Sequence, residues 1–295
     1  MTSTLPTRNP LGGVRPSSAR ALLLVIIGEF VWPAGQAAWS ATLLAALAEF
    51  GIETNAARKA LQRTAATGIM ASGRQGNRVR WSVAPRGERI LSAGWERTYG
   101  WPTRDTRWDG RWLVLSVTVP ESQRKLRHHL QNRLLWAGLG SPVPGEWLTP
   151  HWRRAEQVAG IVRDLELEGQ AHSFVGELGP LGDPLRLVAA AWDLDELRED
   201  YRRFVRTYAR MEPQTDQEHF RARVQLVQDW RRFPYLDPDL PAAYLPRSWP
   251  GPQASRMFTE RYQAWQAASA RYWASTISAG EVPAGEVSAG GVWAG

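Results

Sequence analysis

Residues 55–83 read NAARKALQRTAATGIMASGRQGNRVRWSV, and this stretch decides the fold that we expect for the N-terminal third. Its first half predicts a helix that begins near Thr54, a plausible N-cap, and ends at Gly68. At about 100° per residue, small and apolar side chains share one face of this helix, and amide and basic side chains share the opposite face and its flanks. The inner face comprises Ala57, Ala60, Leu61 and Thr64, and the outer set comprises Asn55, Arg58, Lys59, Gln62 and Arg63.

The second half of the stretch predicts two strands around a tight, basic turn. Ile69–Ala71 and Val79–Val83 flank a turn over Gly73–Asn77, and apolar and polar residues alternate along the second strand. Glycines let such a turn approach another molecule closely, and a basic tip can then meet phosphates. The arginines on or beside the turn are Arg74, Arg78 and Arg80.

The positive charge of the chain is concentrated around this stretch. The net charge of the 295-residue chain is +7, and residues 1–100 carry all of that excess, because 101–295 hold 24 charges of each sign. Two further helices are expected before the stretch, one starting after the Ser17–Ser18 cap and one over residues 40–50. Three helices and a basic hairpin are the order of a winged helix-turn-helix, which binds DNA. A solvated basic face is the commoner reading of one such helix, but the order of elements and the segregated charge favour DNA binding.

The rest of the chain predicts an α+β protein with a ferredoxin-like centre and a helical end. Strands are expected over 112–119, 146–149 and 171–178, with an extended piece over 138–143 and helices over 121–136 and 153–168, an order that fits βαββαβ. A final helix is expected over 252–273. The predicted organisation is a flexible leader (1–17), a winged-helix DNA-binding domain (18–97), a ferredoxin-like central domain (98–185), a C-terminal helical domain (186–275) and a disordered tail (276–295).

No catalytic or metal-binding constellation is present in the sequence, so we expect a protein that is not an enzyme. There is no cysteine, which excludes disulfides and thiolate metal sites, and no phosphate-binding glycine motif occurs. His128 and His129 are adjacent on a predicted helix, so they point to different sides and make a poor metal pair. The apolar run ALLLVIIGEFVW (21–32) is too short for a membrane span and contains Glu29. We therefore expect a cytoplasmic protein without a membrane partner.

Sixteen tryptophans raise the question of an aromatic ligand pocket. Core and domain-interface packing is the better interpretation for most of them. The sharper interpretation is a pocket in which nearby arginines receive phosphates or a carboxylate, although salt bridges to neighbouring acids are the commoner role of any one arginine. The candidate effector-binding residues are Arg202, Arg203, Trp230, Arg231 and Arg232.

Several motifs, in order along the chain, resemble the PaaX-like regulators. They are an R-x-A-L-x-R core over 58–63, the basic hairpin GRQGNRVRWSV, a W-D-G-x-W piece at 108–112 and a D-P-x-L-P piece at 237–241. The resemblance covers roughly residues 18–275. It implies a homodimeric repressor of a phenylacetic acid catabolic operon that binds double-stranded DNA and leaves it when phenylacetyl-CoA binds, without a catalytic cofactor.

Our hypothesis for DNA contact places the helix over 54–67 in the major groove. Asn55, Arg58, Lys59 and Gln62 are assigned to bases, and Arg63, Arg74, Arg78 and Arg80 to phosphates. A dimer would read a pseudo-palindrome with half-sites about 10 bp, or a multiple of that, apart.

Two alternatives remain open at this stage. The central domain resembles the ferredoxin fold of CRISPR-associated endoribonucleases, so a metal-dependent nuclease or RNA-processing enzyme is one. Such an enzyme needs an acidic ligand at the end of the first strand, but the strand WLVLSVTVP contains none; Asp109 precedes it and Glu121 follows it. The other alternative is a regulator of the same fold with a different effector.

Overall fold

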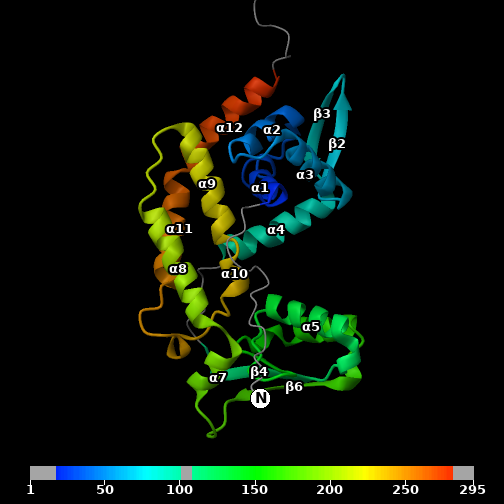
Figure 1. Cartoon of the computed structure of the whole chain (residues 1–295), viewed down its shortest axis with the longest axis vertical. Coiled ribbons are helices and arrows are strands. Elements are labelled where there is room, and N and C mark those ends of the chain that lie inside the picture. Colours follow the sequence, from blue (N-terminus) through cyan, green and yellow to red (C-terminus); the bar gives the residue numbers. More distant parts are fainter. Residues whose placement is uncertain (1–17, 101–107, 282–295) are drawn as a thin grey trace, which may run out of the picture. The chain divides into compact units, whose positions relative to one another are not determined.

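The computed structural model describes residues 18–100 and 108–281, and within them the chain is a mixed α+β protein (Figure 1). Helices predominate, and the described strands form two three-stranded antiparallel sheets. These residues divide into two compact units, each built from segments that lie far apart in the chain. The N-terminal unit comprises residues 18–96, 210–229 and 258–281, and the central unit comprises 97–100, 108–209 and 230–257.

The N-terminal unit begins with a capped helix. The Ser18 hydroxyl accepts a hydrogen bond from the backbone N–H of Ala21 at 3.2 Å, which confirms the predicted cap. This helix, α1 (Ala19–Ile26), then passes into a π-helical turn, Ile27–Val31, shortly before Pro33. The elements that follow α1 are β1 (Ala38–Trp39), α2 (Ser40–Ala48), α3 (Thr54–Ala66), β2 (Met70–Gln75), β3 (Arg78–Val83) and α4 (Pro85–Tyr99).

Strands β1, β2 and β3 form one sheet in the order β1-β3-β2. The two-residue strand β1 pairs with β3, which the sequence analysis did not predict. The hairpin is also longer than predicted, since Gly73 lies within β2 opposite Arg80. Its turn is Gly76–Asn77, and Gly76 takes a φ of 61°, a left-handed conformation that glycine adopts without strain.

The start of α3 also differs from the prediction. Thr54 is the first helical residue, and Glu53 takes the N-cap position without a capping hydrogen bond from its side chain. The helix nevertheless covers the predicted span.

The central unit contains a sheet with a hydrophobic core on each face. Its strands are β4 (Arg111–Val117), β5 (Glu146–Thr149) and β6 (Ala171–Glu177), in the antiparallel order β5-β4-β6. Leu113 and Leu115 pack with α5 (Arg124–Trp136) and α6 (Ala155–Asp164) on one face. Trp112 belongs to a second cluster, on the other face, with Val188 of α7 (Pro184–Ala191).

The predicted extended piece over 138–143 contributes only one bridge to this sheet. Gly140 pairs with Leu148 of β5, and no strand forms over 138–143. Pro142 and Pro144 supply no backbone N–H, so a regular ladder cannot continue there.

The C-terminal helices divide between the two units. α8 (Leu194–Ala209) and α10 (Phe233–Leu236) lie in the central unit, whereas most of α9 (Asp216–Trp230) and all of α12 (Gln266–Glu281) lie in the N-terminal unit. The predicted final helix is two helices, α11 (Gly251–Ala264) and α12, which meet at the buried Trp265. α12 continues into the segment predicted to be disordered; residues 282–295 of that segment, like the predicted leader, lie outside the described residues.

Two glutamates, Glu29 and Glu49, form polar contacts that attach α9 and α12 to the N-terminal part of this unit. Glu29 and Arg223 form an ion pair at 3.1 Å, with side chains only 2% and 6% exposed. Glu49 accepts hydrogen bonds from the Tyr272 hydroxyl at 2.7 Å and from the Gln217 amide at 2.9 Å. The residues expected to read DNA therefore belong to a body that the C-terminal helices complete.

Candidate nucleic-acid interface

The inner face of α3 is confirmed. Ala57, Ala60, Leu61 and Thr64 are each at most 4% exposed, and α3 packs against α1 and α2. The Thr64 hydroxyl donates to the carbonyl of Ala60 at 2.7 Å, so this polar group is satisfied in the core. Small inner side chains let α3 approach its neighbours closely, and the opposite face points to solvent.

The outer face of α3 presents polar and basic groups that the fold does not use. All five side chains are exposed, and within the described part of the chain none makes a hydrogen bond or an ion pair. Cations without acidic neighbours keep their full attraction for a polyanion. These residues are Asn55, Arg58, Lys59, Gln62 and Arg63.

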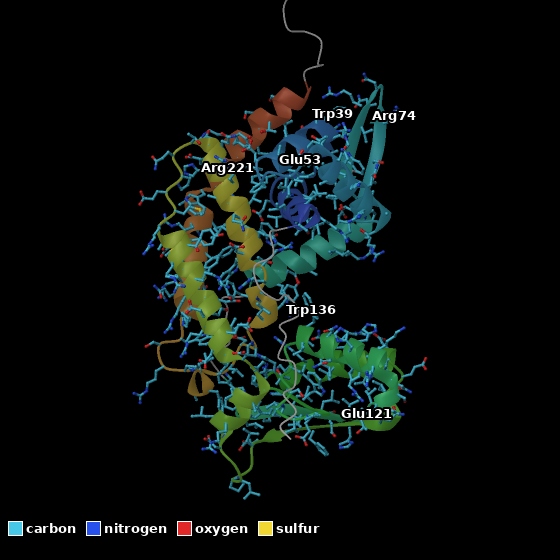
Figure 2. All side chains as sticks on the ribbon, in the orientation of Figure 1. Trp39, Glu53, Arg74, Glu121, Trp136 and Arg221 are labelled. Carbon is cyan, nitrogen blue, oxygen red and sulfur yellow. The ribbon has the colours of Figure 1, made fainter. Side chains whose placement is uncertain are left out.

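The hairpin carries the other predicted cations. Arg74 lies opposite Val79, and Arg78 lies opposite Gln75 beside the turn. Figure 2 shows Arg74 near the free tip of the hairpin, and its side chain is exposed. The structure therefore brings a basic tip and a basic helix face together in one compact unit.

Trp39 organises two of these arginines and was missed by the sequence analysis. The guanidinium carbon of Arg78 lies 4.3 Å from the Trp39 ring centroid, and that of Arg80 lies 5.6 Å from it. Arg80 Nε also donates to the carbonyl of Ala37 at 3.4 Å. Cation–π contacts of this kind hold an arginine in place without neutralising its charge.

Ser40, which follows Trp39 and begins α2, connects this part of the chain to strand β3 of the hairpin. Its hydroxyl accepts a hydrogen bond from Trp81 Nε1 at 2.8 Å and donates to the carbonyl of Val79 at 3.2 Å. The hairpin is thus anchored along β3 as far as Val79, and its turn over Gly76–Asn77 is exposed.

The predicted effector residues lie in the central unit, in contrasting environments. Arg203 and Arg232 both form ion pairs with Asp200, whose side chain is 8% exposed. Arg202 is exposed. Trp230 is fully buried, and its Nε1 donates to the carbonyl of Thr98 at 3.0 Å.

Arg231 differs from the other arginines of that set. Burial lowers the pKa of its guanidinium from the ordinary value, and the nearby Tyr235 opposes that shift. Within the described residues it makes no ion pair. A separate open groove of about 560 Å³ lies along α5 and α6, lined by Arg97 and Trp136 among others, and none of the predicted effector residues lines it.

The acidic residues near β4 show no metal-binding arrangement. The Asp109 carboxylate accepts hydrogen bonds from Arg111 at 2.6 and 2.9 Å and from Trp152 Nε1 at 3.0 Å. The hydrogen bonds from Arg111 hold the pKa of Asp109 at about 2. Across residues 18–100 and 108–281, no group of three or more His, Asp or Glu side chains could hold a metal ion. Nothing in this geometry favours the nuclease alternative.

Family models match nearly all of the described chain. A PaaX-like protein model matches residues 18–87, a PaaX central Cas2-like domain matches 105–188, and a PaaX-like C-terminal domain matches 192–275. The chain belongs to the PaaX-like family. This confirms the resemblance drawn from the R-x-A-L-x-R, W-D-G-x-W and D-P-x-L-P motifs.

Two individual proteins extend the PaaX-like assignment. The transcriptional repressor PaaX of Escherichia coli (strain K12) is 25% identical over 287 residues, which cover 91% of this chain and 87% of that protein. The solved structure of the uncharacterised protein Rv0674 from Mycobacterium tuberculosis matches with a TM-score of 0.56 at 20% identity, over 91% of this chain and all of the other. The PaaX-like family is one of regulators rather than enzymes, as the sequence predicted.

Residues 18–100 and 108–281 contain no helix that could span a membrane. None of their helices combines the length and the apolar character that a bilayer crossing needs.

Proposed function

We propose that this protein is a DNA-binding transcriptional repressor that reads its operator with α3 and the β2–β3 hairpin. The observation that carries the proposal is the exposed set of polar and basic side chains on α3, together with the exposed Arg74 of the hairpin, none of which forms an ion pair within the described residues. Support comes from the similarity to the E. coli repressor over 91% of the chain.

In this proposal the N-terminal unit acts as a winged helix-turn-helix. The order α1, α2, α3, β2, β3, with a short β1 at the outer edge of β3, supports it. The helix α3 enters the major groove, where Asn55, Arg58, Lys59 and Gln62 reach base edges. Phosphates are met by Arg63 from the helix and by the hairpin residues Arg74, Arg78 and Arg80.

The central unit would then be a ferredoxin-like domain that serves dimerisation and regulation. The order β5-β4-β6, with Gly140 bridged to the outer side of β5, matches a βαββαβ sheet whose second strand is reduced to one residue pair. A homodimer would place two copies of α3 on a pseudo-palindromic operator.

The effector is proposed to be phenylacetyl-CoA or a related CoA thioester, with the operon one of phenylacetate catabolism. The candidate contacts remain those predicted from the sequence, and Arg231 is the best supported, because its charge has no ion-pair partner in the described residues. Arg203 and Arg232 would have to leave Asp200, or share it, to bind a phosphate. The proposed effector set is Arg202, Arg203, Trp230, Arg231 and Arg232.

A two-stage binding experiment tests this function. Enrichment of bound duplexes from a random library gives the preferred site, and a gel-shift titration on that site follows, with and without phenylacetyl-CoA. We expect a two-fold symmetric site whose occupancy falls when the thioester is added. Failure to enrich any sequence would refute specific DNA reading, whereas a specific complex that ignores the thioester would favour the same fold with a different effector.

A further inference from the structure

The groove along α5 and α6 is lined by two matched rows of side chains. Each helix contributes four residues at spacings of three, one and three, which place them on one face of the helix. Arg97, near the end of α4, and Ala137 complete the lining. The volume of about 560 Å³ falls within the range of small-molecule sites, about 300–1,000 Å³. The row on α5 is His129, Asn132, Arg133 and Trp136, and that on α6 is Gln157, Gly160, Ile161 and Asp164.

Arg97 brings to this groove a positive charge that the fold holds in place but does not neutralise. Its Nη2 donates to the carbonyl of Trp136 at 3.0 Å, and its Nε donates to the carbonyl of Pro234 at 3.4 Å. Its guanidinium carbon lies 4.0 Å from the Tyr235 ring centroid. These partners are uncharged at pH 7, and within the described residues Arg97 makes no ion pair. Burial lowers the pKa of its guanidinium, and the nearby Tyr235 opposes that shift.

Arg154 places a second half-buried cation close to Arg97. Its Nη1 donates to the carbonyl of Ala137 at 2.8 Å, the residue that follows Trp136 in the chain. Burial and then the nearby charge of Arg97 lower the pKa of Arg154, and Asp239 opposes these shifts. Cations at the carboxyl end of a helix suit its dipole, which is a structural reason for finding them at the end of α5. That end carries only roughly half a negative charge, so the two guanidiniums keep an excess of positive charge even beside Asp239.

Trp136 gives the same end of the groove an aromatic surface. It is the last residue of α5 (Figure 2) and is 40% exposed. Tyr235 contacts it edge to face, with ring centroids 4.6 Å apart, and this contact fixes the orientation of the indole. An indole that is held by a neighbour and open to solvent can stack on a planar ring, while the adjacent guanidinium of Arg97 can bind phosphate.

Gly160 keeps the α6 side of the groove open. It lies inside α6, where glycine destabilises a helix relative to alanine. Its φ is not positive, and within the described part of the chain a Cβ at this position would contact nothing within 4 Å beyond its own helix. Neither backbone conformation nor close packing therefore calls for glycine here, and the space that it leaves belongs to the groove.

We propose that this groove binds a nucleotide, with its phosphates at Arg97 and Arg133 and its planar base against Trp136. Arg133 has donors to spare, because its ion pair with Asp164 at 2.6 Å uses Nη2 alone. This inference rests on the proposed function, since a CoA thioester is one source of such a nucleotide; a free nucleotide is the other. It assigns the phosphates to residues outside the proposed effector set.

Calorimetric titration of the full-length chain separates the two sources. The ligands are phenylacetyl-CoA, CoA, ATP and phenylacetyl-pantetheine, which has neither base nor phosphates. We expect CoA and phenylacetyl-CoA to bind, and phenylacetyl-pantetheine to bind at least tenfold more weakly than phenylacetyl-CoA. ATP that binds as tightly as CoA would support the groove and identify a free nucleotide as its ligand. A chain that binds none of the three nucleotides would overturn the inference, while DNA reading is judged separately by gel shift.

Two variants locate the site, and thermal unfolding checks that each is folded. Arg97→Gln should weaken the binding of CoA by about 10- to 100-fold, the range for a lost hydrogen bond to a charged group. Gly160→Leu should weaken it at least tenfold by filling the groove, and it should fold, because leucine favours a helix and its Cβ has space.

The matched controls lie outside the groove in the same unit. Arg163 is a half-exposed arginine of α6, and Gly169 also has open space at its Cβ; neither lines the groove. Arg163→Gln and Gly169→Leu should therefore bind CoA as the unmodified chain does. Unchanged binding by Arg97→Gln and Gly160→Leu, or an equal loss in the controls, would overturn the groove. A thioester that still released DNA from the unmodified chain would then bind elsewhere, and the proposed repressor would stand.

Discussion

The salt dependence of DNA binding gives a numerical test of the hairpin. Each phosphate contact that releases counterions steepens the slope of log K against log salt by about 0.9. Replacing Arg74 and Arg78 with Ala removes two proposed contacts per protomer. A dimer on both half-sites would lose four, so its slope should become shallower by about 3.6.

The same reasoning predicts the change in affinity. At about 0.1 M salt, each counterion-releasing contact contributes roughly eightfold, so losing four weakens binding by about 10³- to 10⁴-fold. That figure is an upper limit, because the guanidinium of Arg78 lies over Trp39 and has less freedom to meet a phosphate than that of Arg74. The loss should be nearly the same on specific and non-specific duplexes, since phosphates carry no sequence information.

The assay is fluorescence anisotropy on one duplex at five or more salt concentrations, repeated on a scrambled duplex. Arg186→Ala is a matched control, because this arginine is 90% exposed but lies on α7 of the central unit. The control should leave the slope unchanged. A double variant whose line runs parallel to that of the unmodified protein would remove the hairpin from the DNA interface.

Three further changes should produce distinct outcomes. Gln62→Ala should reduce the protein's preference for particular base pairs, by about 1–3 kcal/mol for each bidentate hydrogen-bonding pair that is removed. Competition among single-base variants of the binding site measures this preference. An equal loss of affinity for all of these variants would contradict base reading by Gln62. Arg223→Met should lower the free energy of unfolding by about 3–5 kcal/mol, because Glu29 stays buried without its cation. Adding Glu29→Gln to the same chain should recover part of that loss. Denaturant midpoints measure both changes, and a loss below about 1 kcal/mol would mean that the ion pair is dispensable. Burial, helped by the nearby Arg154, lowers the pKa of His151 to about 4, so the folded state binds a proton at this residue less readily than the unfolded chain does. The contribution of His151 to the free energy of unfolding should therefore be full above about pH 6.5 and should decrease as the pH falls towards 4. His151→Gln should make the free energy of unfolding less dependent on pH in this range, as measured by denaturant unfolding at a series of pH values.

The buried and exposed faces of α3 and the hairpin turn could be predicted because their signals are local. The alternation of small inner and polar outer residues along α3 fixes which face is buried, and Gly76 with its neighbours fixes a turn. Trp39 could not be found in this way. The strand β1 has only two residues, too few to show a period, and its contact with Arg78 and Arg80 depends on a pairing between segments about forty residues apart in the chain.

The proposed effector residues also show that contacts between distant segments cannot be predicted from sequence spacing. The sequence places acids and arginines near one another along α8, and the structure realises that proximity as Asp200 bound by Arg203. Arg232 reaches the same carboxylate from a distant segment, which no spacing rule indicates. The aromatic character of Trp230 was equally visible, but its complete burial depends on tertiary packing. The residue types therefore predict that these side chains could bind an anion, whereas only the fold shows which arginines are already paired with a carboxylate.

Glu29 shows why the N-terminal helices cannot be considered alone. In the sequence it interrupts an apolar run and argues against a membrane span. In the structure its side chain is 2% exposed, and its cation comes from Arg223, 194 residues further along the chain. A buried carboxylate without a partner costs several kcal/mol, which is a large fraction of the stability of a domain. The proposed DNA-reading surface therefore rests on helices whose buried carboxylate is paired only when α9 is in place. A domain boundary drawn near residue 97 would separate that surface from Arg223, the cation that its own core requires.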